Sequence, residues 1–146
     1  LGDVYKRQQI NYSLAHSSVE TFGDNTLVCM DTKEFRWYKK HDFPVMAFSP
    51  QAKGFFAKLA KGDAANNLPE GQYAGPANLA RLAKVKQLSE QTGDTPAKIT
   101  LGYLNSQPFF VSSVFAVTKL WQLDEDMEAQ DLTYDPKTVA FLENMI

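Results

Sequence analysis

The sequence predicts an α/β fold in which short parallel strands alternate with helices. Three segments have the pattern of strands, and two of them, residues 43–48 and 109–117, are almost continuously apolar. Such runs are typical of strands that a parallel sheet buries on both faces. Stretches with apolar residues at helical spacing separate the three segments. This alternation indicates right-handed βαβ units, in which a helix connects one strand to the next parallel strand.

The first two strands are expected on either side of one helix. Residues 9–14, QINYSL, alternate polar and apolar side chains and predict a strand. Residues 16–25 are polar and irregular, so we expect no element there. A helix is expected over residues 32–40, because Asp31 stands directly before it as a candidate N-cap. The apolar run at 43–48 then predicts the second strand.

A loop-rich region with many glycines and prolines follows, from residue 54 to residue 76. Within it an apolar patch at 55–59 predicts one or two helical turns. Residues 78–91 have leucine, alanine and valine at helical spacing, and Gly93 is expected to end that helix. Thr95-Pro96 predicts the start of another helix, with a cap residue followed by proline at the first helical position.

The last part of the chain predicts one strand and two helices. Residues 109–117, FFVSSVFAV, form the third strand candidate. A helix is expected over residues 120–130, with Thr118 placed to cap it, and another begins at Asp135-Pro136. A complete (β/α)8 barrel needs about 250 residues. Three strands in 146 residues therefore predict a piece of such a barrel.

Composition excludes several classes of partner. The net charge is −2 at pH 7, so we expect no nucleic-acid partner, and the lysines at 53, 58 and 61 are interpreted as a solvated face. No apolar stretch approaches the roughly 20 residues that span a bilayer, so we expect no membrane partner. The single cysteine, Cys29, excludes an intramolecular disulfide and indicates a reducing compartment such as the cytoplasm. The sequence has one cysteine and only two histidines, so we expect no metal site.

The first eight residues are interpreted as foreign to the natural protein. The chain begins with Leu1 rather than methionine, which predicts a truncated sequence. Residues 1–8, LGDVYKRQ, resemble translated read-through of a sequencing adapter. We therefore expect the folded fragment to comprise residues 9–146.

Four segments occur in an order and spacing that resemble one known family. Residues 9–14 resemble a strand that usually reads Asn-Gln, two residues, then Tyr-Ser-Leu, with the Asn falling on position 8. Residues 45–54, VMAFSPQAKG, resemble Ala-Tyr-Ser-Pro-Leu-x-x-Gly. Residues 95–104 are similar to the helix before the last strand, and residues 115–126 to Gly-Ala-Ser/Thr, a spacer, then Gln-x-x-Glu-Asn. The family is the aldo/keto reductases, and the resemblance implies about strands six to eight, with their helices, of a (β/α)8 TIM barrel.

This resemblance implies a site for NADP(H), with NAD(H) as the alternative, at the carboxyl ends of the strands. In such barrels a phosphate site often lies on the loops after strands seven and eight and on a helix N-terminus, where free N–H groups favour an anion. Gln9 would hydrogen-bond the carboxamide of nicotinamide. Phe48, where the family often has Tyr, would stack on the nicotinamide ring. Thr118 would face the 2′-phosphate.

The resemblance assigns the rest of the cofactor to the two loops. The loop beside the pyrophosphate would comprise Ser49, Pro50, Gln51, Lys53 and Gly54. Val117 would lie at the start of the last cofactor-binding helix, and Gln122, Glu125 and Asp126 would hold the adenosine end. Three residues depart from the family pattern, because Gln51 replaces Leu, Ala116 replaces Gly and Asp126 replaces Asn. Asp126 thereby loses an amide that would donate to adenine, and Trp121 is interpreted as packing over its helix.

No catalytic residue is expected in this chain. The family's machinery is a Tyr acid with a Lys, an Asp and a His, all from the first four strands, upstream of Gln9. His16 and His41 have no neighbouring nucleophile or carboxylate arrangement, and Tyr12 is interpreted as packing. The resemblance therefore implies that the isolated chain is inactive.

Three functions are compatible with these residues. The first is an oxidoreductase that reduces aldehydes or ketones, small carbonyl substrates, with NADPH, represented here by its C-terminal half. The second is a regulatory subunit of the same fold that binds the cofactor without catalysis, because fold does not imply function. The third is a stand-alone half-barrel without enzyme activity. The upstream Asp, Tyr, Lys and His would separate the first two, and an upstream reading frame would exclude the third.

Overall fold

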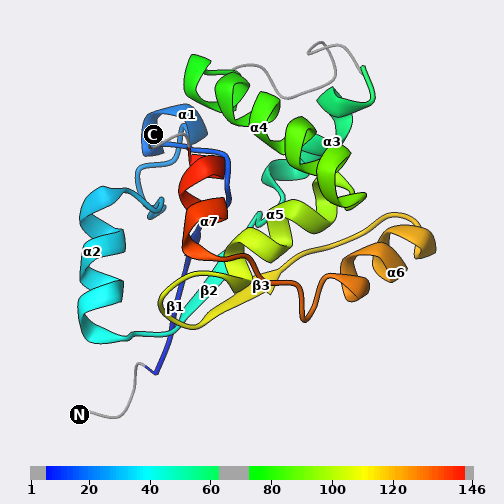
Figure 1. Ribbon diagram of the computed structural model, residues 1–146. Coiled ribbons are helices and arrows are strands. Elements are labelled where there is room, and N and C mark those ends of the chain that lie inside the picture. The colour runs from blue at the N-terminus through cyan, green and yellow to red at the C-terminus, as the bar shows by residue number, and fades with distance from the viewer. Residues whose placement is uncertain (1–5, 63–72, 144–146) are drawn as a thin grey trace.

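The three expected strands form one parallel sheet (Figure 1). In this computed structural model, which describes residues 6–62 and 73–143, the strands are β1 (Gln8–Asn11), β2 (Val45–Phe48) and β3 (Val111–Val114). Their order is β1-β2-β3, and both pairs are parallel. The register places Asn11, Phe48 and Val114 in one row at the carboxyl ends of the strands. The α/β interpretation with a parallel sheet is confirmed.

Helices occupy the segments between and after the strands. They are α1 (Val19–Phe22), α2 (Thr32–His41), α3 (Phe55–Ala60), α4 (Pro76–Thr92), α5 (Pro96–Asn105), α6 (Leu120–Glu128) and α7 (Pro136–Glu143), with a 3-10 turn at Ala52–Gly54 before α3. Most of the region expected to be loop-rich precedes α4, and its residues 63–72 lie outside the described part of the chain.

The predicted helix boundaries follow from local hydrogen bonds. Asp31 caps α2, because its Oδ1 accepts from the Glu34 backbone N–H at 2.8 Å. The Thr95 hydroxyl likewise accepts from the Lys98 N–H at 3.3 Å at the start of α5. Gly93 ends α4 with a left-handed φ of 80°, a conformation that costs glycine little. Such local chemistry is readable from sequence, and these three predictions are confirmed.

Four expectations were wrong at the level of detail. The first strand, expected over residues 9–14, ends at Asn11. The third strand ends at Val114, and residues 115–117 continue as a loop toward α6. A short helix, α1, lies in the segment expected to be irregular, where Ser18 and Thr21 cap each other. Thr118 does not cap α6, whose N-cap is Lys119.

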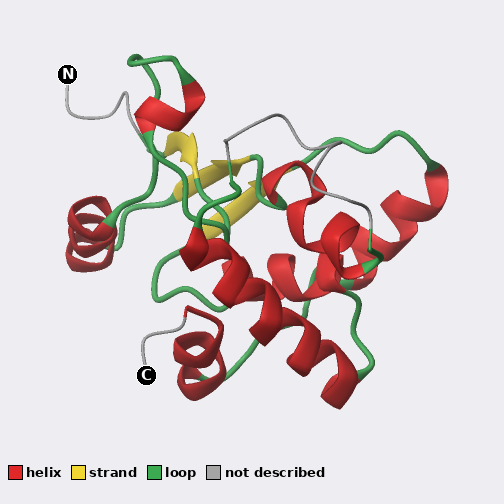
Figure 2. Cartoon of the chain, turned by 90° about the horizontal axis from the view of Figure 1, so that it is seen from above, coloured by secondary structure: helices red, strands yellow, loops and turns green. Residues whose placement is uncertain are grey.

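The sheet has a covered face and an open face. Successive residues of a strand point to opposite faces, so the row of Ile10 and Ala47 faces away from the row of Phe48 and Val114. Ile10 and Ala47 are fully buried, whereas Phe48 is half-buried and Val114 exposed. Helix α5 packs against β3, α4 packs against α5, and α7 packs against α4. Helices α5, α4 and α7 therefore form successive layers beyond β3. Figure 2 shows the helices around the three strands from above.

A glycine in α5 allows the closest approach in this helical layer. A methyl group on Gly102 would lie 2.8 Å from Cε2 of Tyr134 and 2.9 Å from Cγ of Leu132, closer than carbon atoms pack. The segment after α6 can therefore lie directly on α5. None of the described helices is long and apolar enough to cross a membrane.

Candidate functional site

The loop after β2 has an unusual backbone. Ser49, Ala52 and Lys53 have left-handed φ values of 53°, 50° and 56°, and Gly54 follows at 79°. Only the glycine adopts this region without steric cost, and the other three each store strain. Packing holds the loop in place, since Pro50 is buried and Ala52 is inaccessible to solvent. The loop is therefore fixed before any ligand arrives.

The loop after β3 is held differently, by one side chain at the start of α6. Oε1 of Gln122 accepts from the backbone N–H groups of Thr118 and Lys119, both at 3.0 Å. It also accepts from the Thr118 hydroxyl at 3.1 Å. Gln122 thus satisfies N–H groups that we expected to be free for an anion, because a glutamine at the third helical position can reach back to the cap.

A hydrogen bond joins the two loops across 75 residues of sequence. Nε2 of Gln51 donates to Oδ1 of Asp126 at 2.6 Å. Asp126 is only 4% exposed. Burial raises the pKa of this carboxyl, the Gln51 hydrogen bond lowers it, and the neighbouring Glu125 charge raises it, with a net upward direction. The contact fixes the distance between the β2 loop and α6.

A cleft of about 600 Å³ opens beside this contact, between the β2 and β3 loops and the ends of α3, α4 and α5. Half of the residues predicted to bind the cofactor line it: Gln51, Gly54, Val117, Gln122, Glu125 and Asp126. They come from both loops and from α6. The structure therefore brings together the predicted pyrophosphate loop and the predicted adenosine residues.

The other predicted cofactor residues lie outside the cleft lining, namely Gln9, Phe48, Ser49, Pro50, Lys53 and Thr118. Gln9 and Phe48 occupy neighbouring strands, and the register places both on the open face of the sheet. The Lys53 ammonium lies 5.9 Å from the ring centre of Phe22, and neither residue lines the cleft.

Among the cleft residues that the sequence did not assign to the cofactor are three lysines and a tryptophan. Lys58, Lys61 and Lys86 come from α3 and α4 or their ends, and Trp121 from α6. We expected the α3 lysines to form a solvated face and Trp121 to pack over its helix. The available signal was the pair at positions 58 and 61, one helical turn apart and directly after the glycine loop.

A second, smaller cavity of about 200 Å³ lies between the end of β1 and helices α2, α4, α5 and α7. Tyr12 borders it and packs edge-on against Tyr103 and stacked against Phe109. Burial raises the pKa of the Tyr12 hydroxyl, which weakens it further as an acid. Its environment supports the interpretation of Tyr12 as a packing residue.

Comparison with known proteins identifies the family. The aldo/keto reductase family model matches residues 25–146. The chain belongs to the aldo/keto reductase family. The match begins after β1, so it leaves the resemblance of residues 9–14 untested.

Solved aldo/keto reductases share the fold. An enzyme from Klebsiella pneumoniae, crystallised with NADP and acetate, has a TM-score of 0.60 and 19% identity over 95% of this chain and 38% of its own. A K. pneumoniae reductase crystallised with NADPH has a TM-score of 0.57 and 19% identity, over 94% of this chain and 38% of its own. A thermostable reductase crystallised with the inhibitor epalrestat has a TM-score of 0.60 and 13% identity, over 96% of this chain and 39% of its own. The chain thus spans 38–39% of the length of these proteins, and at such identities the likeness concerns the fold alone.

Proposed function

We propose that this chain is the cofactor-binding, C-terminal part of an NADP-dependent cytoplasmic reductase of aldehydes or ketones. Its strands would be strands six to eight of a (β/α)8 barrel. The observation that carries the proposal is the cleft at the carboxyl ends of β2 and β3, where ligands bind in barrels of this kind. Membership of the family and the NADP-bound state of the K. pneumoniae structures support the same cofactor.

The residues of the cleft fit a dinucleotide. The β2 loop, already fixed by its packing, would lie along the pyrophosphate near Gly54, whose lack of a side chain leaves room for close approach. Asp126 would present a carboxylate to the adenine amino group. Gln122 would leave the N–H groups of Thr118 and Lys119 when a phosphate replaces its amide oxygen there.

Gln9 and Phe48 would hold the nicotinamide end on the open face of the sheet. Both side chains lie on that face, on adjacent strands. When bound, NADPH would supply a hydride to the carbonyl carbon of the substrate. Phe48 would support the ring by stacking, and Gln9 would orient it through the carboxamide.

The acid that protonates the carbonyl oxygen would come from the rest of the protein. We propose that the upstream reading frame encodes about five further βα units, with an Asp, a Tyr, a Lys and a His at successive strand ends. The 146-residue chain alone would then be inactive. A native start codon directly before Gln9 would refute this part of the proposal.

The decisive experiment uses the protein encoded by the complete reading frame. Titration with NADPH and NADH by fluorescence measures binding, and loss of absorbance at 340 nm with a panel of aldehydes and ketones measures turnover. Binding of NADPH with turnover supports the proposal. Binding without turnover assigns the protein to the non-catalytic, regulatory alternative. Binding of neither cofactor contradicts the proposal altogether.

We also propose that residues 1–8 are foreign to the natural protein and that Asn stands at position 8. In the structure Gln8 begins β1, and its Oε1 accepts from the Tyr38 hydroxyl at 2.8 Å. An asparagine is one methylene shorter, so this bond would be lost or lengthened in the natural protein. Sequencing independent clones of the gene decides the matter, since recovery of LGDVYKRQ in them would show the segment to be native.

A further inference from the structure

Two side chains of the cleft have no role in the function proposed above. Trp121 lies in the first turn of α6, and Lys61 directly follows α3. Trp121 lines the cleft but remains 54% exposed, which is unusual for so large an apolar side chain. The Lys61 ammonium lies 5.3 Å from its ring centre, so the two meet across the cleft as a cation–π pair.

Trp121 and Lys61 together have the chemistry of a binding site for a heteroaromatic ring that carries a phosphate. The face of an exposed indole stacks on any purine base. An ammonium beside it can form a charge-assisted hydrogen bond to a phosphate. Of the other cleft lysines, Lys58 already donates to the Lys53 carbonyl at 2.9 Å, which leaves Lys61 and Lys86 better placed for a ligand.

The opposing charges restrict where a phosphate can bind. Glu90, Glu125 and Asp126 also line the cleft, so it is not uniformly basic. Asp126 lies at the contact with Gln51, whereas Lys61 lies over Trp121. A ligand with an amino-bearing ring and a separate phosphate matches this division, because the carboxylates favour the amino group and the ammonium favours the phosphate.

We propose that Trp121 and Lys61 form the subsite that selects the phosphorylated adenosine end of the cofactor. The adenine ring takes over the indole face that Lys61 covers in the free protein, and the displaced ammonium pairs with the 2′-phosphate. This inference rests on the proposed function. It moves phosphate selection from Thr118, which lies outside the cleft lining, to a lysine at the end of α3.

The test uses 2′,5′-ADP, which carries the adenosine and the 2′-phosphate without nicotinamide, and 5′-ADP, which lacks the 2′-phosphate. Calorimetric titration of the complete protein measures both dissociation constants. Trp121→Ala is expected to weaken both ligands about tenfold or more, and Trp121→Phe, which keeps an aromatic face, to retain most of the affinity. Lys61→Met is expected to weaken 2′,5′-ADP several-fold and to spare 5′-ADP.

Two matched variants control for general effects. Lys84→Met removes another cation–π ammonium, which lies 4.4 Å from the Phe141 ring and outside the cleft lining. Trp37→Phe changes the other tryptophan of the sequence, on α2. Both should leave the two dissociation constants unchanged. A thermal melt of each variant reports folding, and if Trp121→Ala fails to fold, Trp121→Phe and Lys61→Met still decide.

The outcomes separate the inference from the proposed function. If the unsubstituted protein binds NADPH but Lys61→Met loses no preference for 2′,5′-ADP over 5′-ADP, the inference is wrong and the proposed function stands. Unchanged affinity in Trp121→Ala overturns the inference in the same way, as does failure of 2′,5′-ADP to bind when NADPH binds. If the unsubstituted protein binds none of NADPH, NADH and 2′,5′-ADP, the proposed function itself fails.

Discussion

Helix α5 precedes β3 in the sequence and α6 follows it, and the two helices contact each other. They differ in how they are attached to the rest of the structure. Seven of the ten residues of α5 are buried, namely Ala97, Ile99, Thr100, Leu101, Gly102, Tyr103 and Leu104. In α6 the buried side chain is Asp126. Large apolar residues of α6 are exposed instead, among them Leu120 at 81%, with Trp121, Leu123 and Met127. One helix belongs to the core and the other rests on its surface.

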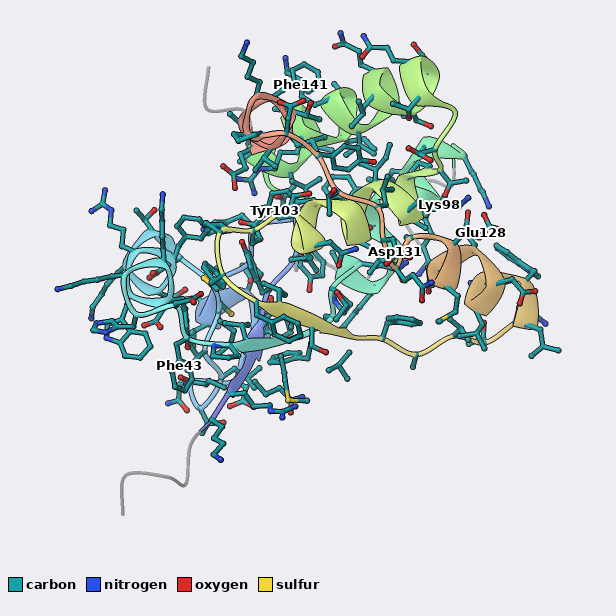
Figure 3. All side chains as sticks on the ribbon, turned by 60° about the horizontal axis from the view of Figure 1, so that its bottom comes forward. Phe43, Lys98, Tyr103, Glu128, Asp131 and Phe141 are labelled. Carbon is teal, nitrogen blue, oxygen red and sulfur yellow. The ribbon has the colours of Figure 1, made fainter. Side chains whose placement is uncertain are left out.

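Besides the cation–π pair of Trp121 with Lys61, two polar contacts attach α6 to the rest of the described structure. Lys98 of α5 and Glu128 form an ion pair, and their side chains point toward each other in Figure 3. Gln51 holds Asp126 from the β2 loop. Contacts of this kind respond to ligands and to pH more readily than apolar burial does. We therefore expect α6, the helix assigned to the cofactor, to adjust when a ligand binds, and α5 to act as its rigid support.

The largest effect is expected when the chain is studied without the rest of the barrel. In the described sheet β1 and β3 are edge strands, β1 being bridged on its outer side only between Asn11 and Cys29, and Phe110 beside β3 is 66% exposed. Unpaired edges and exposed apolar side chains promote association. The 146-residue chain alone should therefore be self-associated or poorly folded by sedimentation and circular dichroism. A cooperative thermal melt of a monomer in dilute solution would contradict this expectation.

A second prediction tests the close packing on α5. Gly102→Ala places a methyl group against Tyr134 and Leu132 and is expected to cost about 1–3 kcal/mol of unfolding free energy. Gly75→Ala, at the N-cap of α4, is the control, because a methyl group there meets no atom within 4 Å, and it should cost less than Gly102→Ala. Urea denaturation of the complete protein measures both. Equal effects would mean that α5 is not the rigid element.

The sequence predicted the ends of the helices and the residues of the cleft to different extents. The caps of α2 and α5 and the end of α4 follow from residues such as Asp31 and Thr95 that act on their own neighbours. The cleft residues of the two loops were predicted through the family resemblance. Trp121 and Lys61 were missed because their proximity depends on how α3 and α6 meet in space, which no local pattern encodes. Gln122 was assigned to a ligand, whereas the free structure uses it as a local cap.

A third prediction concerns the link between the β2 loop and α6. Gln51→Ala removes the donor to Asp126 and leaves a buried carboxylate without that hydrogen bond. We expect a loss of about 1–3 kcal/mol of unfolding free energy, because a buried acceptor is left without this hydrogen bond. Gln87→Ala, at an exposed position of α4, is the control. Equal stability of the two variants by urea denaturation would show that the link contributes nothing.

The smallest expected effect is a pH-dependent gain in Asp126→Asn. Burial raises the pKa of Asp126 above its ordinary value of 3.8, so the unfolded chain loses this proton at a lower pH than the folded protein. Ionisation therefore costs stability as the pH rises through that window. Asparagine keeps an oxygen that accepts from Gln51 without a charge, so the variant should be more stable at pH 7, and the gain should shrink as the pH falls toward 3.8. Asp124→Asn, at an exposed position of the same helix, controls for the change in net charge.

Hydrogen–deuterium exchange of the complete protein, with and without saturating NADPH, tests the central claim most directly. In the free protein the amides of α6 should exchange faster than those of α5, because α6 lies on the surface and α5 in the core. NADPH should then slow exchange in residues 49–56 and 116–126, which supply the cleft, and leave α2 unchanged. If bound NADPH altered neither segment, the cleft between the β2 loop and α6 would not be the cofactor site.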